Sequence, residues 1–212
     1  LGPAGEIAGE LLPEVARGKL ARFCDVFCET EVFSVEESER ILRRGAELGL
    51  GVKVHADELT PLGGAELAAR LGAVSADHLL CVSEAGIDAL ASSGTVATLL
   101  PGTSFFLNAT PAPARRMIER GVTVALATDC NPGTCYSSSV PSMLALAVRE
   151  MGLTPAEALH AATAGSARAL RRNDIGRVTV GSRADLTVLD APSYLHLVYR
   201  PGVPLARALD LG

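Results

Sequence analysis

Short runs of small and branched apolar residues alternate with longer amphipathic segments along this chain. The apolar runs begin near Arg22, Gly51, Ala73, Thr95 and Val122 and contain few polar residues. Such runs are typical of strands that are buried on both faces of a sheet. The intervals between them match successive βα units of about 30 residues. The pattern therefore predicts an α/β fold built from consecutive βα units.

The ends of the intervening helices are marked by capping residues. Ser34 and Glu37 form a capping box, and Gly49 ends the helix that they start. Ser83 caps a further helix that Gly94 closes. The expected strands are Arg22–Phe27, Val52–His55, Ala73–Leu79, Thr95–Leu100 and Val122–Thr128, and the other expected helices in this region are Gly64–Leu71 and Pro113–Arg120.

The two ends of the chain differ from this repeating pattern. Residues 1–19 contain Pro3 and Pro13 and read as an entry loop with a short helix near residues 9–16. After Thr128 we expect three helices, which are Val140–Met151, one from the Thr154 capping box to Ala162, and Ser166–Leu170. The tail is punctuated by glycine and proline, with strand-like pieces at Gly176–Val178, Gly181–Leu189 and Tyr194–Tyr199. We expect residues 1–170 to form one domain and residues 171–212 part of a small β domain.

Composition narrows the class of protein. An apolar content of 48% and a charged content of 20% over 212 residues predict a globular chain. The net charge of -5, without a basic run, argues against nucleic acid as a partner. No apolar run approaches the roughly 20 residues of a membrane span, so we expect no membrane association. The five cysteines form no zinc-ribbon pairs and indicate reduced thiols in a cytoplasmic protein.

Three side chains able to bind metal or transfer protons occur where expected strands end. His55 opens the sequence HADE, His78 closes SADH, and Asp129 follows VTVALAT. Alone, each is more often a hydrogen-bonded rim residue or a helix cap, but three equivalent positions favour a site. Imidazole and carboxylate together suit zinc or iron. Glu58 lies close enough to share this site, or it is a solvated loop carboxylate.

Three other residues receive weaker interpretations. Lys53 shares a strand face with His55 by the period of two, and could orient a carboxylate or simply pair with one. His160 and His196 lie away from any strand end and read as structural or surface residues.

Five motifs carry a family resemblance, and they occur in the family's order. These are DVFCE (25–29), HADE (55–58), SADH (75–78), LLPGT (99–103) and TDCNPGT (128–134). Together they resemble the imidazolonepropionases, which are histidine-degrading members of the metal-dependent amidohydrolases. The resemblance runs from about Phe23 to Tyr199, with the tail similar only at the superfamily level. It implies the C-terminal half of a (β/α)8 TIM barrel, about strands four to eight, with part of a small β-sandwich domain.

The resemblance also implies roles for individual residues. His55 and Asp129 would be metal ligands from the fifth and eighth barrel strands, for one divalent zinc or an iron ion. His78, from the sixth strand, would act on the substrate carbonyl or the attacking water. Glu58 would contact the imidazolone ring and transfer protons, as Asp129 would. The substrate-binding turn would contain Asn131, Gly133 and Thr134.

The implied reaction is hydrolysis of the cyclic amide of 4-imidazolone-5-propanoate to N-formimidoyl-L-glutamate by a homodimeric enzyme. One departure from the family is clear, because the family's H-x-H pair of metal ligands occurs nowhere in this sequence. We therefore expect a fragment, and the propionate-binding residues would lie in the missing half. Another cyclic amidase or deaminase of the superfamily, or a non-catalytic half-barrel, remains open. A half-barrel has unpaired sheet edges, so we expect the chain alone to self-associate.

Overall fold

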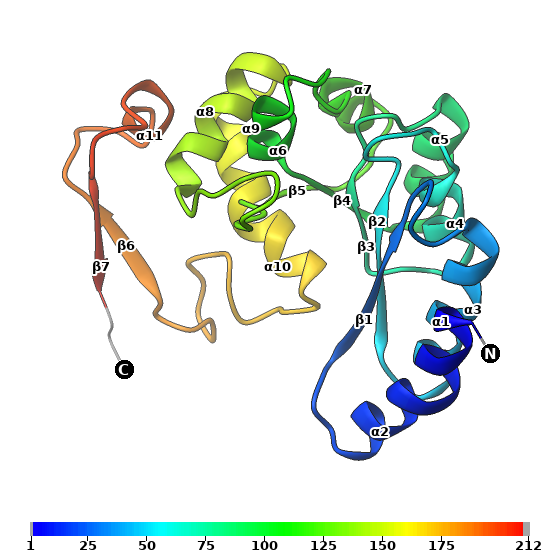
Figure 1. Ribbon diagram of the computed structural model, residues 1–212. Helices are drawn as coiled ribbons and strands as arrows, with labels where there is room; N and C mark the ends of the chain where they lie inside the picture. The colour runs from blue at the N-terminus through cyan, green and yellow to red at the C-terminus, as the bar shows by residue number, and fades with distance from the viewer. Residues whose placement is uncertain (1, 210–212) are drawn as a thin grey trace. The chain divides into compact units, whose positions relative to one another are not determined.

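The computed structural model describes residues 2–209, which form two compact units (Figure 1). The first unit contains the chain up to Ala97 together with Met117–Thr123, and the second contains Thr98–Arg116 and the chain from Val124 onward. Five strands form one sheet in the order β1-β2-β3-β4-β5. Strand β4 (Val96–Leu99) and helix α7 (Ala114–Glu119) cross the boundary between the units.

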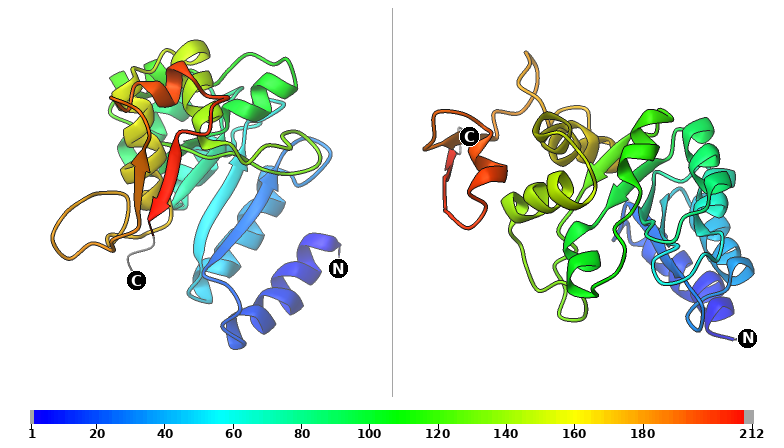
Figure 2. Two further views of the ribbon diagram at one scale, coloured as in Figure 1. Left: turned by 90° about the vertical axis from the view of Figure 1, so that its left-hand side faces the viewer. Right: turned by 90° about the horizontal axis from the view of Figure 1, so that it is seen from above.

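The first unit is built on three parallel strands. These are β1 (Phe23–Cys28), β2 (Gly51–Ala56) and β3 (Ser75–His78), with Phe27 opposite His55 and His55 opposite Asp77. Helices α3 (Val35–Glu47), α4 (Gly64–Arg70) and α5 (Glu84–Ser93) lie on one side of these strands (Figure 2). The fully buried core includes Ile41, Leu42, Val54, Leu67, Ile87 and Leu90. The predicted strands and helices of this unit are confirmed, with ends that differ by no more than two residues.

The chain begins with a longer helix than the sequence predicts. Segments α1 (Pro3–Glu6), η1 (Ile7–Leu11) and α2 (Leu12–Arg17) follow one another without a break, and η1 is a π-helical turn. The expected entry loop is therefore wrong. Pro3 lies in the first helical turn, where its missing N–H is tolerated. Pro13 is the second residue after the π-helical turn, and such a turn is an irregularity that accommodates a lost backbone hydrogen bond.

The second unit contains the remaining barrel-type elements. Helix α6 (Pro101–Phe106), which the sequence pattern did not predict, follows β4 directly, and β5 is short (Val124–Leu126). Helix α8 (Val140–Glu150) precedes a continuous helical run of α9 (Pro155–His160), η2 (Ala161–Gly165) and α10 (Ser166–Ala169). The predicted Thr154 capping box is present at the start of α9.

The described part of the tail is less regular than predicted. Strands β6 (Leu186–Leu189) and β7 (Ala206–Leu209) form an antiparallel pair. Residues 176–178 are not in a strand, and residues 196–199, expected to be extended, form the short helix α11 (His196–Tyr199). Short apolar runs fit a helix or a strand equally well, and local hydrogen bonds decide here. The boundary between a barrel and a small β domain at residue 170 stays a prediction.

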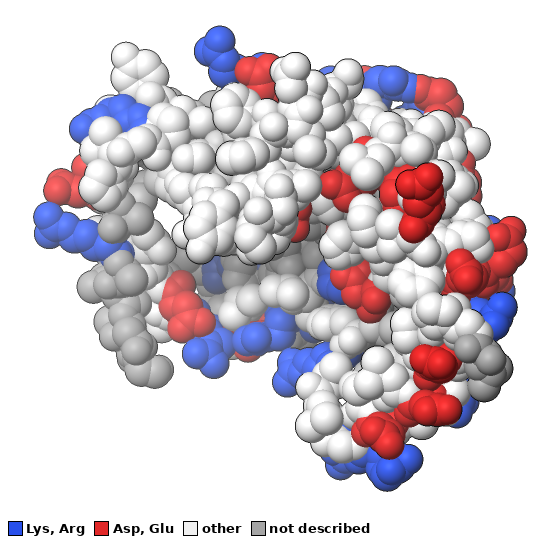
Figure 3. Space-filling view, in the orientation of Figure 1, with Lys and Arg blue, Asp and Glu red and all other residues white. Residues whose placement is uncertain are grey.

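Three features of the described residues concern possible partners: the lengths of the helices, the surface charge and the state of the cysteines. Among the described residues, no helix combines the length and apolar character needed to cross a membrane. On the face drawn in Figure 3, lysine and arginine side chains of the described residues lie interspersed with aspartate and glutamate. All five cysteines are free thiols.

Candidate active site

His55 and His78 lie side by side at the carboxyl ends of β2 and β3. Their ring centroids are 5.2 Å apart, with the planes tilted by 45°. His78 is almost completely buried, and its backbone has a positive φ of 75°, a strained conformation for a residue other than glycine. This strain ends the strand and turns the imidazole to its position beside His55.

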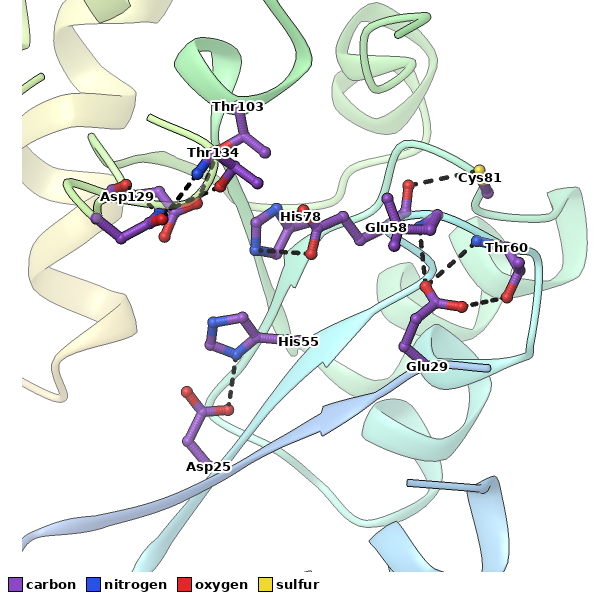
Figure 4. A network of polar contacts seen from close by, with 12 residues as sticks. Asp25, Glu29, His55, Glu58, Thr60, His78, Cys81, Thr103, Asp129 and Thr134 are labelled. Atoms are coloured by element: carbon purple, nitrogen blue, oxygen red, sulfur yellow. Dashed lines mark hydrogen bonds and ion pairs between the residues drawn. The ribbon is translucent and has the colours of Figure 1, made fainter. Parts of the chain in front are cut away.

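Glu58 faces His78 from the loop after β2. Its Oε2 lies 3.5 Å from His78 Nε2, and the two side chains are only 7% and 2% exposed (Figure 4). A carboxylate in so dry a position needs a polar or charged partner, and the imidazole provides one. The first unit thus brings together three of the predicted site residues, His55, His78 and Glu58.

Asp25 contacts His55 from the neighbouring strand. Its Oδ1 lies 3.1 Å from His55 Nδ1, between neighbouring strands β1 and β2 (Figure 4). Both side chains are about one-third exposed, with His55 at 32% and Asp25 at 37%. The DVFCE motif was the sequence signal that included Asp25, but nothing in the motif predicted a contact between Asp25 and His55.

A second buried carboxylate, Glu29, fixes the loop that carries Glu58. It accepts hydrogen bonds from the backbone N–H groups of Thr30 and Leu59, at 2.8 Å each, and from Thr60 through both its N–H and its hydroxyl. Burial alone would raise the pKa of Glu29, but these hydrogen bonds outweigh it and lower that pKa. Glu29 is therefore a structural anion that holds residues 58–60 beside β1.

Two further charged side chains, Lys53 and Asp77, lie on the same face of the sheet as His55. Lys53 Nζ lies 2.5 Å from Ser75 Oγ, which donates to Asp77 Oδ1 at 2.7 Å. Burial raises the pKa of Asp77, while the nearby Lys53 charge and the Ser75 hydrogen bond oppose that rise. Interiors of such barrels are usually filled with branched apolar residues, so a polar row here is unusual.

In the second unit, Asp129 lies three residues beyond the end of β5, not at the end of a strand reaching Thr128 as predicted. Its φ is 50°, and its Oδ2 accepts a hydrogen bond of 2.7 Å from the fully buried hydroxyl of Thr103 in α6. The hydroxyl therefore holds one of the two carboxylate oxygens in place. Thr103 belongs to the LLPGT motif, but the sequence gave no reason to pair it with Asp129.

The turn after Asp129 is organised by Asn131. Asn131 Oδ1 accepts from the N–H groups of Gly133 and Thr134 at 2.8 and 2.9 Å, and Nδ2 donates to the Asp129 carbonyl and to Thr134 Oγ1. This is an Asx-type turn, in which the side chain completes the loop itself. Asn131 thus shapes the segment, while Gly133 is exposed and Thr134 partly so.

The described residues include donor atoms of the types that bind transition metals. Asp25, His55 and Asp77 offer ligand atoms within 4.8 Å of one another, and Asp129 offers a carboxylate in the second unit. Imidazole with carboxylate is a donor set that zinc and iron accept. His160 and His196 belong to α9 and α11 in the second unit.

A series of βα units with histidines at the carboxyl ends of parallel strands is the arrangement of TIM-barrel enzymes. The chain belongs to the amidohydrolase family, whose family model matches residues 32–206. An imidazolonepropionase of Salinispora arenicola (strain CNS-205) is 53% identical over 205 residues, covering 96% of this chain and 52% of that protein. One from Streptomyces griseus subsp. griseus is 55% identical over 189 residues, covering 89% and 48%. The chain spans about half the length of the curated relatives it matches.

Solved structures agree with this family. An adenosine deaminase from Xanthomonas campestris with bound zinc has a TM-score of 0.70 and 26% identity, covering 91% of this chain and 51% of that one. A triazine hydrolase variant has a TM-score of 0.74 at 18% identity, covering 93% and 52%, and supports the fold alone. The prediction of an α/β fold of the amidohydrolase TIM-barrel type is confirmed.

Proposed function

We propose that this chain contributes the catalytic end of an imidazolonepropionase, which hydrolyses 4-imidazolone-5-propanoate to N-formimidoyl-L-glutamate. The observation that carries the proposal is the convergence of His55, His78 and Glu58 at the ends of two neighbouring strands. It is supported by identities of 53% and 55% to relatives named imidazolonepropionase.

His55 and Asp129 are the proposed ligands of one zinc or iron ion. When bound, such an ion lowers the pKa of water and supplies a nucleophile near neutral pH. The ligand set is supported by the strand-end position of His55 and by Thr103, which holds one Asp129 oxygen at 2.7 Å. In the chain described here the donor set has one histidine and one aspartate, and the sequence contains no H-x-H pair.

Different residues of the chain carry out the separate proton transfers of the proposed reaction. Asp129 takes a proton from the attacking water, whose oxygen forms a bond to the ring carbonyl carbon. His78, kept in place by Glu58, donates a hydrogen bond to the oxygen on which charge develops. When the ring C–N bond breaks, the proton returns to the leaving nitrogen from Asp129 or Glu58. Asn131, Gly133 and Thr134 are the proposed substrate-binding residues, in a turn whose shape the Asn131 side chain fixes.

We further propose that the enzyme acts in histidine degradation in the cytoplasm, as a homodimer. The free state of all five cysteines fits a reducing compartment.

A chimera tests the proposed reaction most directly. The matching segment of the Salinispora arenicola relative is replaced by this chain, and conversion of imidazolonepropanoate is followed by absorbance. We expect turnover, with a loss of about 100-fold or more in kcat for His78→Asn. Ser92→Ala, a surface change on α5, is the matched control. A folded, metal-loaded chimera that is inactive on this substrate but deaminates a purine would contradict the proposal.

A further inference from the structure

Two carboxylates and a lysine lie on the same face of the sheet as His55, and the proposed reaction uses none of them. Asp25 comes from β1, Lys53 from β2, and Asp77 from β3. The contacts given above connect them, since Asp25 contacts His55 at 3.1 Å and Lys53 reaches Asp77 through Ser75. The residues that alternate with them along β1 and β2 are buried and apolar, so the polar row faces the side of the sheet on which His55 lies.

The Asp25 contact decides which ring nitrogen of a neutral His55 carries the proton. An ionised carboxylate only accepts hydrogen bonds, so the contact with Asp25 Oδ1 requires a proton on Nδ1. The lone pair of the neutral ring is then on Nε2. Histidines that bind metals usually donate their other N–H to a carboxylate or carbonyl group, which fixes both tautomer and ring orientation.

We propose that Asp25 is a positioning residue, which holds His55 as the Nδ1–H tautomer and so presents Nε2 as the metal-binding atom. The inference rests on the proposed function only for the identity of the atom that Nε2 binds. The contact between Asp25 Oδ1 and His55 Nδ1 does not depend on that function.

The same cluster has a competing interpretation, in which Asp25, His55 and Asp77 together bind a cation. Their ligand atoms lie within 4.8 Å of one another. Two observations favour positioning. A cation there would have to displace the Nδ1 proton that the Asp25 contact requires. Asp77 also already has a cationic neighbour, since Lys53 reaches it through Ser75 and its charge acts on the Asp77 carboxyl. A second positive charge in this place would be repelled.

The test is the tautomer of His55 in the metal-free chain, read from ring nitrogen shifts in two-dimensional NMR with 15N-labelled histidine. The chain has four histidines, and His55→Gln assigns the signal. Spectra are recorded at about pH 8.5, above the usual imidazole pKa. We expect a protonated Nδ1 in the wild type, a shift to the Nε2–H form in Asp25→Leu, and restoration in Asp25→Glu. Asp77→Asn is the matched control and should leave the tautomer unchanged.

Several outcomes overturn the inference. The wild-type ring could carry its proton on Nε2 or on both nitrogens, or Asp25→Leu could leave the tautomer unaltered while the spectrum of the remaining chain shows a native fold. Addition of zinc separates the two interpretations of the cluster. If zinc removes the Nδ1 proton, and Asp77→Asn abolishes the effect, the cluster is a cation site and the positioning role is wrong.

The zinc titration also tests the proposed function separately. We expect zinc to shift His55 Nε2 while the Nδ1 proton persists, and Asp25→Leu to weaken zinc binding by about 10- to 100-fold. A wild-type Nδ1–H tautomer that depends on Asp25, with no zinc response at Nε2, supports the positioning role and contradicts the proposed metal ligand.

Discussion

Three backbone N–H groups at the start of α4 are bound by one buried side chain, Asp57. Gly63 and Gly64 donate to its Oδ1 at 2.8 and 3.0 Å, and Ala65 donates to its Oδ2 at 2.9 Å. We predict that Asp57→Ala lowers the free energy of unfolding by about 1–3 kcal/mol, because buried donors lose their acceptor. Urea denaturation of both proteins measures the difference.

The control for this prediction is Asp88→Ala. The Asp88 side chain is 68% exposed and contacts only the surface residue Arg120 among the pairs described, so the change should be within about 0.5 kcal/mol. An equal effect of the two substitutions would contradict the role of Asp57.

The pair of Arg115 and Glu157 makes part of the stability depend on pH. The hydrogen bond from Arg115 is the main reason that the pKa of Glu157 falls from 4.5 to about 2. A depressed folded-state pKa gives a contribution that is full above about pH 4.5 and is lost as the pH falls through about 2. We predict that Glu157→Gln removes roughly 1 kcal/mol near neutral pH, because solvent screens this partly exposed pair.

Chemical denaturation between about pH 7 and pH 2 measures this effect. The difference between the wild type and Glu157→Gln should shrink as the pH falls below about 4.5. In the Arg115→Gln background the same substitution should have a smaller and less pH-dependent effect. A difference that stays constant with pH would show that ionisation of Glu157 does not contribute to stability.

The predicted site residues that the structure brings together could be recognised from their positions in the sequence alone. His55 and His78 end apolar strands, and HADE brings Glu58 three residues after His55. Asp25 and Thr103 were not singled out, because their roles come from contacts with residues 30 and 26 positions away. Such pairings are set by the register of the strands and by the packing of α6, which no local pattern encodes.

The close approach of η2 to β5 depends on a glycine. A Cβ built on Gly165 would overlap the carbonyl oxygen of Val124, and Ser166 also donates to the Leu126 carbonyl at 2.9 Å. We predict that Gly165→Ala destabilises the chain by about 1–3 kcal/mol through overpacking. Thermal unfolding monitored by circular dichroism measures the change.

Gly9 provides a matched control, because it also lies in a π-helical turn. A Cβ at Gly9 meets nothing within 4 Å. Gly9→Ala should be neutral or stabilise the chain by up to about 1 kcal/mol through helix propensity. If both substitutions have the same sign and size, the packing of η2 against β5 is not what requires glycine.

Helices and strands with strong local signals were predicted well, and those with mixed signals were not. The capping boxes of Ser34 and Thr154 mark real helix starts. Helix α6 was missed because its first residues, Pro101 and Gly102, usually indicate a turn. Gly102 is needed there, since a Cβ would lie 2.5 Å from Cys135 Sγ. Tertiary packing therefore overrides local propensity in this helix.

The chain exposes apolar side chains that a stable monomer would normally cover. In α6, Phe105 is 67% and Phe106 64% exposed, and Tyr136 is 80% exposed. Strand β1 is at one edge of the described sheet, with hydrogen-bonding groups available to another chain. Large exposed apolar patches and open strand edges both favour association. We therefore predict concentration-dependent self-association of this chain, measured by sedimentation velocity.

The double substitution Phe105→Glu with Phe106→Glu should shift the chain toward monomer, because it replaces two exposed aromatic side chains by charges. Thr179→Glu with Ser182→Glu adds the same charge at two exposed polar positions and is the matched control. If both double variants weaken association equally, net charge is responsible and α6 is not the contact. If neither does, pairing at the edge strand β1 is the remaining source of association. A wild-type chain that stays monomeric at all concentrations would show that neither the exposed aromatic residues nor the open edge of the sheet causes association.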